Sequence, residues 1–144
     1  MYKHILIPTD GSALSAKAIE QGVGLAKSLG AKVTGVTVSI PFHAFALDPM
    51  MVADTSEHYK KDCEDRAQQS LGAVRLAAQA AGVPCDVVHV TADPYEGIID
   101  TAIGRGCDLI YMASHGRKGI SALLLGSETQ KVLTHSKIPV LVCR

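Results

Sequence analysis

Five short apolar runs alternate along the chain with segments of helical periodicity, and this alternation limits most strongly the folds open to the chain. The runs are His4–Thr9, Lys32–Ile40, Cys85–Val90, Cys107–Ala113 and Ile138–Cys143. Strands that are apolar at nearly every position are typical of parallel sheets covered on both faces. Repeated right-handed crossovers then predict a doubly wound α/β fold, Rossmann-like, with an open parallel five-stranded sheet and helices on both faces.

Start and stop signals delimit the first two predicted helices. Ala13–Leu29 has apolar residues at helical spacing, and Gly30 stands where a left-handed glycine would end the helix. A second helix is predicted to begin at Asp54 or Thr55 and to stop at Gly82.

Two further helices have cap-like first residues. Asp93 as N-cap, Pro94 at the first helical position and Glu96 at the third predict one helix start. Ser127-Glu128-Thr129-Gln130 resembles a capping box, with the Ser127 hydroxyl available to the first-turn N–H groups of the last helix.

The connection Pro41–Ala53 is long and apolar. Connections of this length inside a compact domain tend to be lids or mobile segments. A cover for a ligand or partner and a loop packed on its own domain both remain open.

Composition limits the kinds of partner. The 144 residues, 47% of them hydrophobic, are enough for one domain spanning residues 1–144, and no apolar run approaches membrane-spanning length. The first residues lack the features of a signal peptide, so we expect a cytoplasmic protein without a membrane partner. Equal numbers of basic and acidic residues, 14 each, give no sign of a nucleic-acid surface, and a small-molecule partner is favoured.

The cysteines and histidines do not form a metal site pattern. Cys63, Cys85, Cys107 and Cys143 lie far apart without a C-x-x-C pair, so reduced thiols are expected rather than zinc or a redox dithiol. His115 lies in a glycine-containing loop but has no evident orienting carboxylate, and we interpret it as a polar loop residue.

The segment Ala113–Ser127, ASHGRKGISALLLGS, joins a predicted strand to a predicted helix. Gly116 and Gly126 allow close approach to the main chain, Arg117 adds charge, and a helix N-terminus offers free N–H groups to an anion. An anion-binding loop and an ordinary connection before a capped helix are the two interpretations. In strand order 3-2-1-4-5 this loop would face Pro8–Ser12 across one crevice at the carboxyl ends of the strands.

The chain resembles the universal stress protein family in three stretches: Ile5–Ser12, the glycine loop Ala113–Ser127, and Lys137–Val142. The family's nucleotide-binding branch carries the pattern glycine, two residues, glycine, nine residues, glycine, then Ser or Thr. The pattern falls here on Ala113, Gly116, Gly126 and Ser127, with alanine in place of the first glycine.

The resemblance implies ATP binding and assigns residues to the nucleotide. Pro8 and Thr9 would line the base pocket, Val38 would contact adenine, and Asp10 would approach the ribose or the metal–phosphate region. The phosphates would be surrounded by Gly116, Arg117, Gly126, Ser127 and Glu128. Mg²⁺ would arrive with the nucleotide, Asp10 being the candidate protein ligand.

Two main classes of function remain: an ATP-binding regulator of the stress response, and a dimeric stress-response interaction module without nucleotide affinity. An enzyme that transfers adenylyl or phosphoryl groups on the same α/β framework is a weaker third. The sequence offers only fragments of a phosphoryl-transfer site, so we expect ATP to be held and hydrolysed slowly if at all. The apolar strand Ile138–Cys143 at a sheet edge predicts a homodimer through that strand, as does the resemblance.

Overall fold

The computed structural model describes residues 1–42, 49–117 and 124–144. The elements in chain order are β1 (His4–Pro8), α1 (Ala13–Leu29), β2 (Lys32–Ser39), α2 (Pro49–Ala81), β3 (Cys85–Thr91), α3 (Pro94–Gly104), β4 (Leu109–Ala113), α4 (Ser127–His135) and β5 (Val140–Cys143). No helix within these three ranges is long and apolar enough to cross a membrane.

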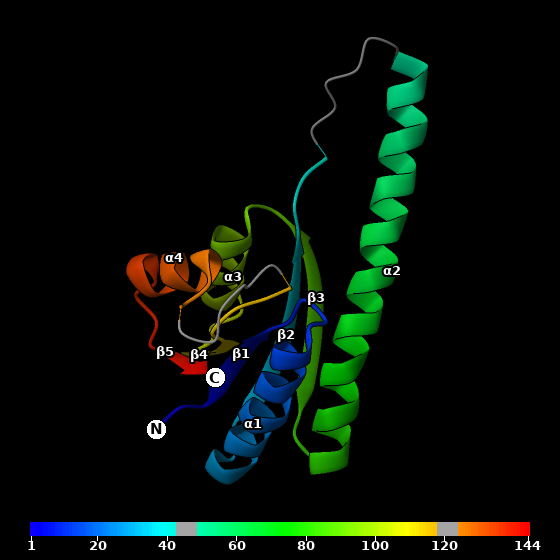
Figure 1. Cartoon of the computed structure of the whole chain (residues 1–144). Helices are drawn as coiled ribbons and strands as arrows, with labels where there is room; N and C mark the ends of the chain where they lie inside the picture. The colour runs from blue at the N-terminus through cyan, green and yellow to red at the C-terminus, as the bar shows by residue number, and fades with distance from the viewer. Residues whose placement is uncertain (43–48, 118–123) are drawn as a thin grey trace.

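The strands form one parallel sheet in the order β3-β2-β1-β4-β5, which confirms the predicted fold class and strand order. Helices α1 and α2 cover one face, and α3 and α4 cover the other (Figure 1). The central strand β1 alternates between two apolar cores, with Ile5 and Ile7 on the α1–α2 side and Leu6 on the α3–α4 side. All three side chains are fully buried, because β1 is covered on both faces.

Helix α2 begins at Pro49, five residues before the predicted start at Asp54. The prediction of a loop over Pro41–Ala53 is therefore wrong for its last five residues, while residues 43–48 lie outside the described part. Proline at the first helical position needs no N–H donor, and methionine and alanine after it favour helix. Pro49 was thus a start signal, interpreted as a loop residue.

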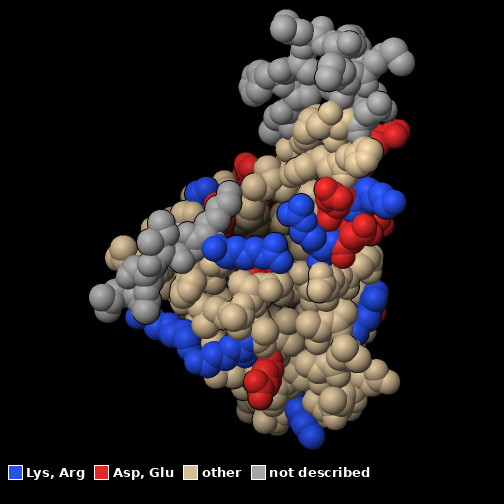
Figure 2. All heavy atoms as spheres, turned by 45° about the vertical axis from the view of Figure 1, so that its right-hand side comes forward, with Lys and Arg blue, Asp and Glu red and all other residues tan. Residues whose placement is uncertain are grey.

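The exposed side of α2 carries mixed charge, as its sequence predicts. Lys60, Lys61, Glu64 and Asp65 are all exposed. Figure 2 shows basic and acidic side chains interspersed on the face that α2 brings forward. Interspersed charge of this kind is typical of a solvated helix surface.

The predicted stop of α1 at Gly30 and the predicted start of α3 after Asp93 are confirmed, whereas the predicted capping box of α4 is wrong. Ser12 caps α1 by accepting a hydrogen bond from the Ser15 N–H, and Gly30 ends the helix with a φ of 63°. Asp93 occupies the N-cap position of α3 without making a side-chain cap bond. Gly126, not Ser127, is the N-cap of α4, so the Ser127 hydroxyl is one position too far along to cap it.

Strands β4 and β5 begin later than predicted, at Leu109 and Val140. Cys107 donates its N–H to the Ala102 carbonyl and so belongs to the turn that follows α3, not to the strand. Pro139 has no N–H to donate to a strand partner. The apolar character of Cys107 and Ile138 reflects core packing outside the strands.

Candidate functional site

The loops after β1 and β4 meet at the carboxyl edge of the sheet, because these strands are neighbours. Asp10 joins the two loops: its Oδ2 accepts a hydrogen bond from the Arg117 N–H at 2.9 Å, and its Oδ1 accepts one from the Ser12 N–H at 3.0 Å. The expectation that the loops after β1 and β4 lie next to each other is confirmed. A single carboxylate holds the start of the glycine loop against the start of α1.

The charged form of Asp10 is favoured by these contacts. Burial alone would raise the pKa of the carboxyl, but hydrogen bonds from Ser12, Arg117 and Ser15 stabilise the carboxylate and hold the pKa below its ordinary value. Asp10 therefore stays negative near neutral pH. A carboxylate has about four lone-pair positions, so two hydrogen bonds leave room for a hydroxyl or a hydrated cation.

The two loop glycines are needed for close approach. A Cβ on Gly116 would collide with Asp10 Oδ2. A Cβ on Gly126 would lie 3.1 Å from the Cα of His115, and the Gly126 N–H already donates to the Ser114 carbonyl at 2.7 Å. Both glycines therefore bring main chain against main chain or carboxylate where a side chain would not fit.

The N-terminus of α4 lies beside this glycine contact. No side chain caps the helix among the described residues, so the N–H groups of Ser127 and Glu128 in the first turn remain available to an anion. Thr129 fixes the helix to β4 by donating its hydroxyl to the Ala113 carbonyl at 3.1 Å.

Ala113 replaces the first glycine of the family pattern without backbone strain. No described non-glycine residue has a positive φ, so this position does not require glycine. Its side chain belongs to the core on the α1–α2 side and is 9% exposed. The extra methyl group points into the protein interior, not into the loop crevice.

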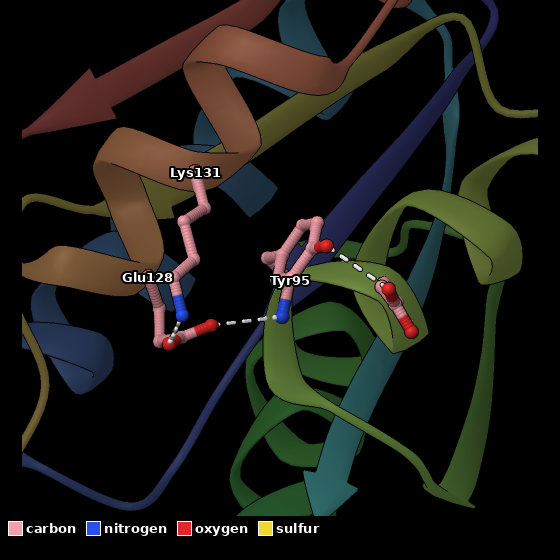
Figure 3. A network of polar contacts seen from close by, with 4 residues as sticks. Tyr95, Glu128 and Lys131 are labelled. Atoms are coloured by element: carbon pink, nitrogen blue, oxygen red, sulfur yellow. Dashed lines mark hydrogen bonds and ion pairs between the residues drawn. The ribbon is translucent and has the colours of Figure 1, made fainter.

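Glu128 lies in a network between α3 and α4 (Figure 3). Its Oε2 accepts the Tyr95 N–H at 3.0 Å, and its Oε1 pairs with Lys131 Nζ at 3.0 Å. Figure 3 shows the carboxylate turned toward the first turn of α3. Glu128 thus supplies the cap that Asp93 was predicted to supply.

The predicted base-pocket residues lie on different sides of the sheet. Thr9 is buried toward α1, where its hydroxyl donates to Ser15 Oγ at 3.1 Å. Val38 packs with the α3–α4 core, close to Gly97. Pro8, at the end of β1, is half-buried. The main chain of Thr9 nevertheless lies beside the end of β2, because its N–H donates to the Val36 carbonyl and its carbonyl accepts the Thr37 hydroxyl, both at 2.9 Å.

One residue near the site was missed by the sequence analysis. Ser70 in α2 is 6% exposed and lines a pocket beside Gly11 and Arg117. The signal was a polar residue on the otherwise apolar face formed by Ala67, Leu71 and Val74. The apolar spacing predicted a core-facing side of the helix, and the Ser70 hydroxyl within it was not interpreted as part of a site.

The whole chain, residues 1–144, matches the model of the universal stress protein family. The chain belongs to the universal stress protein family. It is 34% identical over 146 residues to a universal stress protein of Thermus aquaticus, covering all of both chains. Its fold is similar to that of the protein MJ0577 of Methanocaldococcus jannaschii, with a TM-score of 0.83 at 27% identity, covering 99% of this chain and 95% of that one.

Some structural relatives hold adenine nucleotides. One universal stress protein in complex with cAMP matches with a TM-score of 0.70 at 24% identity, over 99% of this chain and 97% of that one. The universal stress protein of Archaeoglobus fulgidus in complex with dAMP matches with a TM-score of 0.71 at 16% identity, over 99% and 98%. At these identities the likeness establishes the shared fold.

Proposed function

We propose that this universal stress protein binds an adenine nucleotide, ATP with Mg²⁺, at the carboxyl edge between β1 and β4, and acts as a nucleotide-dependent regulator in the stress response. The observation that carries the proposal is the contact between Asp10 and the Arg117 N–H, which holds the glycine loop at the edge where α4 starts. The complexes of two relatives with cAMP and dAMP support an adenine nucleotide as the ligand class.

The phosphates would lie at the start of α4. Its first-turn N–H groups and the positive end of its dipole attract negative charge, and Gly126 leaves the main chain accessible. Thr129 holds the helix start in place through Ala113. Affinity in the micromolar range is expected, because charge-assisted contacts to phosphate must offset the entropy lost on association.

Mg²⁺ fits this arrangement as a companion of the nucleotide. The described residues contain no group of three His, Cys, Asp or Glu side chains that would hold an ion by themselves. Mg²⁺ keeps several waters and takes one or two carboxylates beside phosphate oxygens, which matches a single Asp10. Bound Mg²⁺ would neutralise phosphate charge, while Asp10 would orient the ribose or a metal-bound water.

The ligand is proposed to be held, not turned over. Fast hydrolysis needs a residue that orients the attacking water. His115 contacts Ser114 Oγ through Nδ1 at 3.2 Å, and no carboxylate among the described residues orients it. A single-turnover assay with protein in excess over labelled ATP checks this: a rate above about 1 s⁻¹ that is lost in Asp10→Asn would make the protein an enzyme.

Ser127→Asp tests the phosphate position. Ser127 is exposed, and an acidic residue in the first turn stabilises a helix, so the variant is expected to fold. The new carboxylate would occupy the place of the phosphates and repel them, so calorimetry with ATP and Mg²⁺ should find the affinity at least tenfold weaker. Gln68→Glu, an exposed position of α2, is the control with the same charge change.

Equal ATP affinity in Ser127→Asp and Gln68→Glu would place the phosphates elsewhere. A wild-type protein that binds no adenine nucleotide would contradict the proposal and leave the alternative, a dimeric interaction module of the stress response. The methyl group of Ala113 does not favour that alternative, since it is turned into the core.

We also propose a homodimer through the edge strand β5. Leu141 is 40% exposed on this strand, whereas Val140 and Val142 pack against the α3–α4 core. Leu141→Lys therefore tests the interface without disturbing the core. Sedimentation should show a dimer for the wild type and a monomer for the variant; a monomeric wild type rules the dimer out, and a dimeric variant puts the interface elsewhere.

A further inference from the structure

A pocket apart from the start of α4 is lined by residues of α1, of α2 and of the loops after β1 and β4. Helices α1 and α2 lie on the face of the sheet opposite α4 (Figure 1). Its volume is about 250 Å³. Its described lining residues include Thr9, Gly11, Ser12, Ser15, Ser70 and Arg117, and none of the described ones is acidic. Arg117 is therefore the one described lining residue with a charge, and the pocket is positive and rich in hydroxyls.

Ser70 is a largely buried residue whose hydroxyl faces the pocket and has no partner among the described residues. Each of the other buried polar side chains that the structure describes makes a side-chain hydrogen bond. Ser70 is 6% exposed, and its Oγ makes no hydrogen bond to a described residue. No buried side-chain N or O atom in the described part of the chain lacks a partner, so Ser70 Oγ is open to the pocket and is free to donate to an occupant there.

The Ser70 hydroxyl and the Arg117 guanidinium converge on one point. A Cβ on Gly11 would lie 2.8 Å from Ser70 Oγ and 2.9 Å from Arg117 Nη2. Gly11 has a φ of 79° and no side chain, so the space between the two donors stays open. The hydroxyls of Ser12 and Ser15 are engaged with each other's main chain and cannot fill it.

The start of α1 adds to the positive potential of this pocket. The first turn of the helix contains no acidic residue, although the Asp10 carboxylate accepts the N–H of the N-cap Ser12 just before it. The Asp10 carboxylate is not among the described lining residues and is bound by the Ser12 and Arg117 N–H groups. A neutral ligand would leave Arg117 without a counter-charge.

We propose that the pocket between α1 and α2 binds a small oxyanion of the phosphate type, with the Arg117 guanidinium supplying the charge and Ser70 Oγ donating a hydrogen bond. The site is separate from the α4 start. Arg117 links the two, because its N–H holds Asp10 while its guanidinium reaches the pocket. The phosphoryl group has two possible sources, free phosphate and the end of a nucleotide phosphate chain.

The experiment is an NMR titration with inorganic phosphate at constant ionic strength, following the amides of Gly11 and Ser70. It is done on the Ser127→Asp protein, in which the nucleotide site is disabled. Saturable shifts are expected. Adding Ser70→Ala or Arg117→Gln should each weaken binding about tenfold or more, since a hydrogen bond or charge to the anion is lost. Ser28→Ala, an exposed serine of α1, is the matched control.

Three results decide the matter. Tighter phosphate binding in Ser28→Ala than in Ser70→Ala supports a site for free phosphate. A second result is that phosphate does not bind, while Ser70→Ala made in the wild-type chain binds ATP more weakly and AMP unchanged. This result supports the same site, filled by the end of the nucleotide phosphate chain. Unchanged affinities for phosphate, ATP and AMP in Ser70→Ala and Arg117→Gln overturn the proposal and leave a water-filled pocket. Arg117 is exposed, so its variant reports even if Ser70→Ala unfolds.

Discussion

Glu128 should contribute more to stability than its exposed ion pair would suggest, because it caps a helix other than its own. Its Oε2 accepts the Tyr95 N–H at the start of α3 at 3.0 Å. Loss of a cap of this kind costs about 1 kcal/mol. The pair with Lys131 joins an exposed lysine to the half-buried Glu128, so solvent screens it and it adds little. Glu128→Ala should therefore lower the free energy of unfolding by about 1–2 kcal/mol, or about 3–6 °C in Tm for a domain of this size.

Urea unfolding followed by circular dichroism measures this cost, and three variants separate its parts. Lys131→Gln removes only the ion pair and should change stability by less than about 0.5 kcal/mol. Glu128→Gln keeps an acceptor oxygen for Tyr95 and should fall between wild type and Glu128→Ala. Asp93→Ala should be nearly neutral, since Asp93 makes no side-chain cap bond. If Asp93→Ala destabilises as much as Glu128→Ala, the cap has been assigned to the wrong carboxylate.

Three further predictions concern α1, the turn after α3 and the loop after β1. Thermal melts should show Gly24→Ala stabilising by about 0.5–1 kcal/mol and Gly22→Ala destabilising, because a Cβ on Gly24 meets nothing within 4 Å whereas one on Gly22 would lie 2.8 Å from the Ile7 Cδ1; equal effects would contradict the packing. Cys107 should resist iodoacetamide at pH 8 until the protein is unfolded, since burial and then Asp108 raise the pKa of its thiol to about 11; rapid modification of the native protein would contradict this. Asp10 has a pKa lowered from 3.8, so its charge stabilises the fold above about pH 4 and this contribution is lost as pH falls further; the stability difference between wild type and Asp10→Asn should shrink from pH 7 to pH 3, and a constant difference would refute the assignment.

The fold class and the central strand were predictable because one physical signal, burial on both faces, identifies them. β1 is buried on both faces, so Ile5, Leu6 and Ile7 are apolar in succession, and only a sheet covered by helices on both sides accommodates such a run. α1 was predicted to the residue, because its apolar spacing and the left-handed Gly30 at its end are local signals. An element that depends only on residues close together in sequence was predictable from their hydrophobic pattern.

The parts that failed depend on partners far away in sequence. Asp93 and Glu128 are both acidic residues near a helix start, and local spacing ranks Asp93 first as the cap of α3. The choice falls on Glu128 because packing of α4 beside α3 brings its carboxylate to the Tyr95 N–H, 33 positions away. A rule based on neighbouring residues cannot find a hydrogen bond between residues 33 positions apart.

The same reasoning applies to the second pocket. Arg117 was expected to contact phosphates at the glycine loop, and its charge and position in that loop suggested nothing else. Its backbone N–H does stay at the loop edge, bound to Asp10. Because Gly11 has no side chain, the guanidinium reaches the α1–α2 side, where Ser70 of α2 lies. The long side chain of arginine can place its charge far from its own main chain. The Arg117 N–H, which binds Asp10, and the Arg117 guanidinium must therefore be tested separately. The pair Arg117→Gln and Asp10→Asn makes that separation: the first removes the guanidinium and keeps the N–H bond, and the second weakens the bond and keeps the guanidinium.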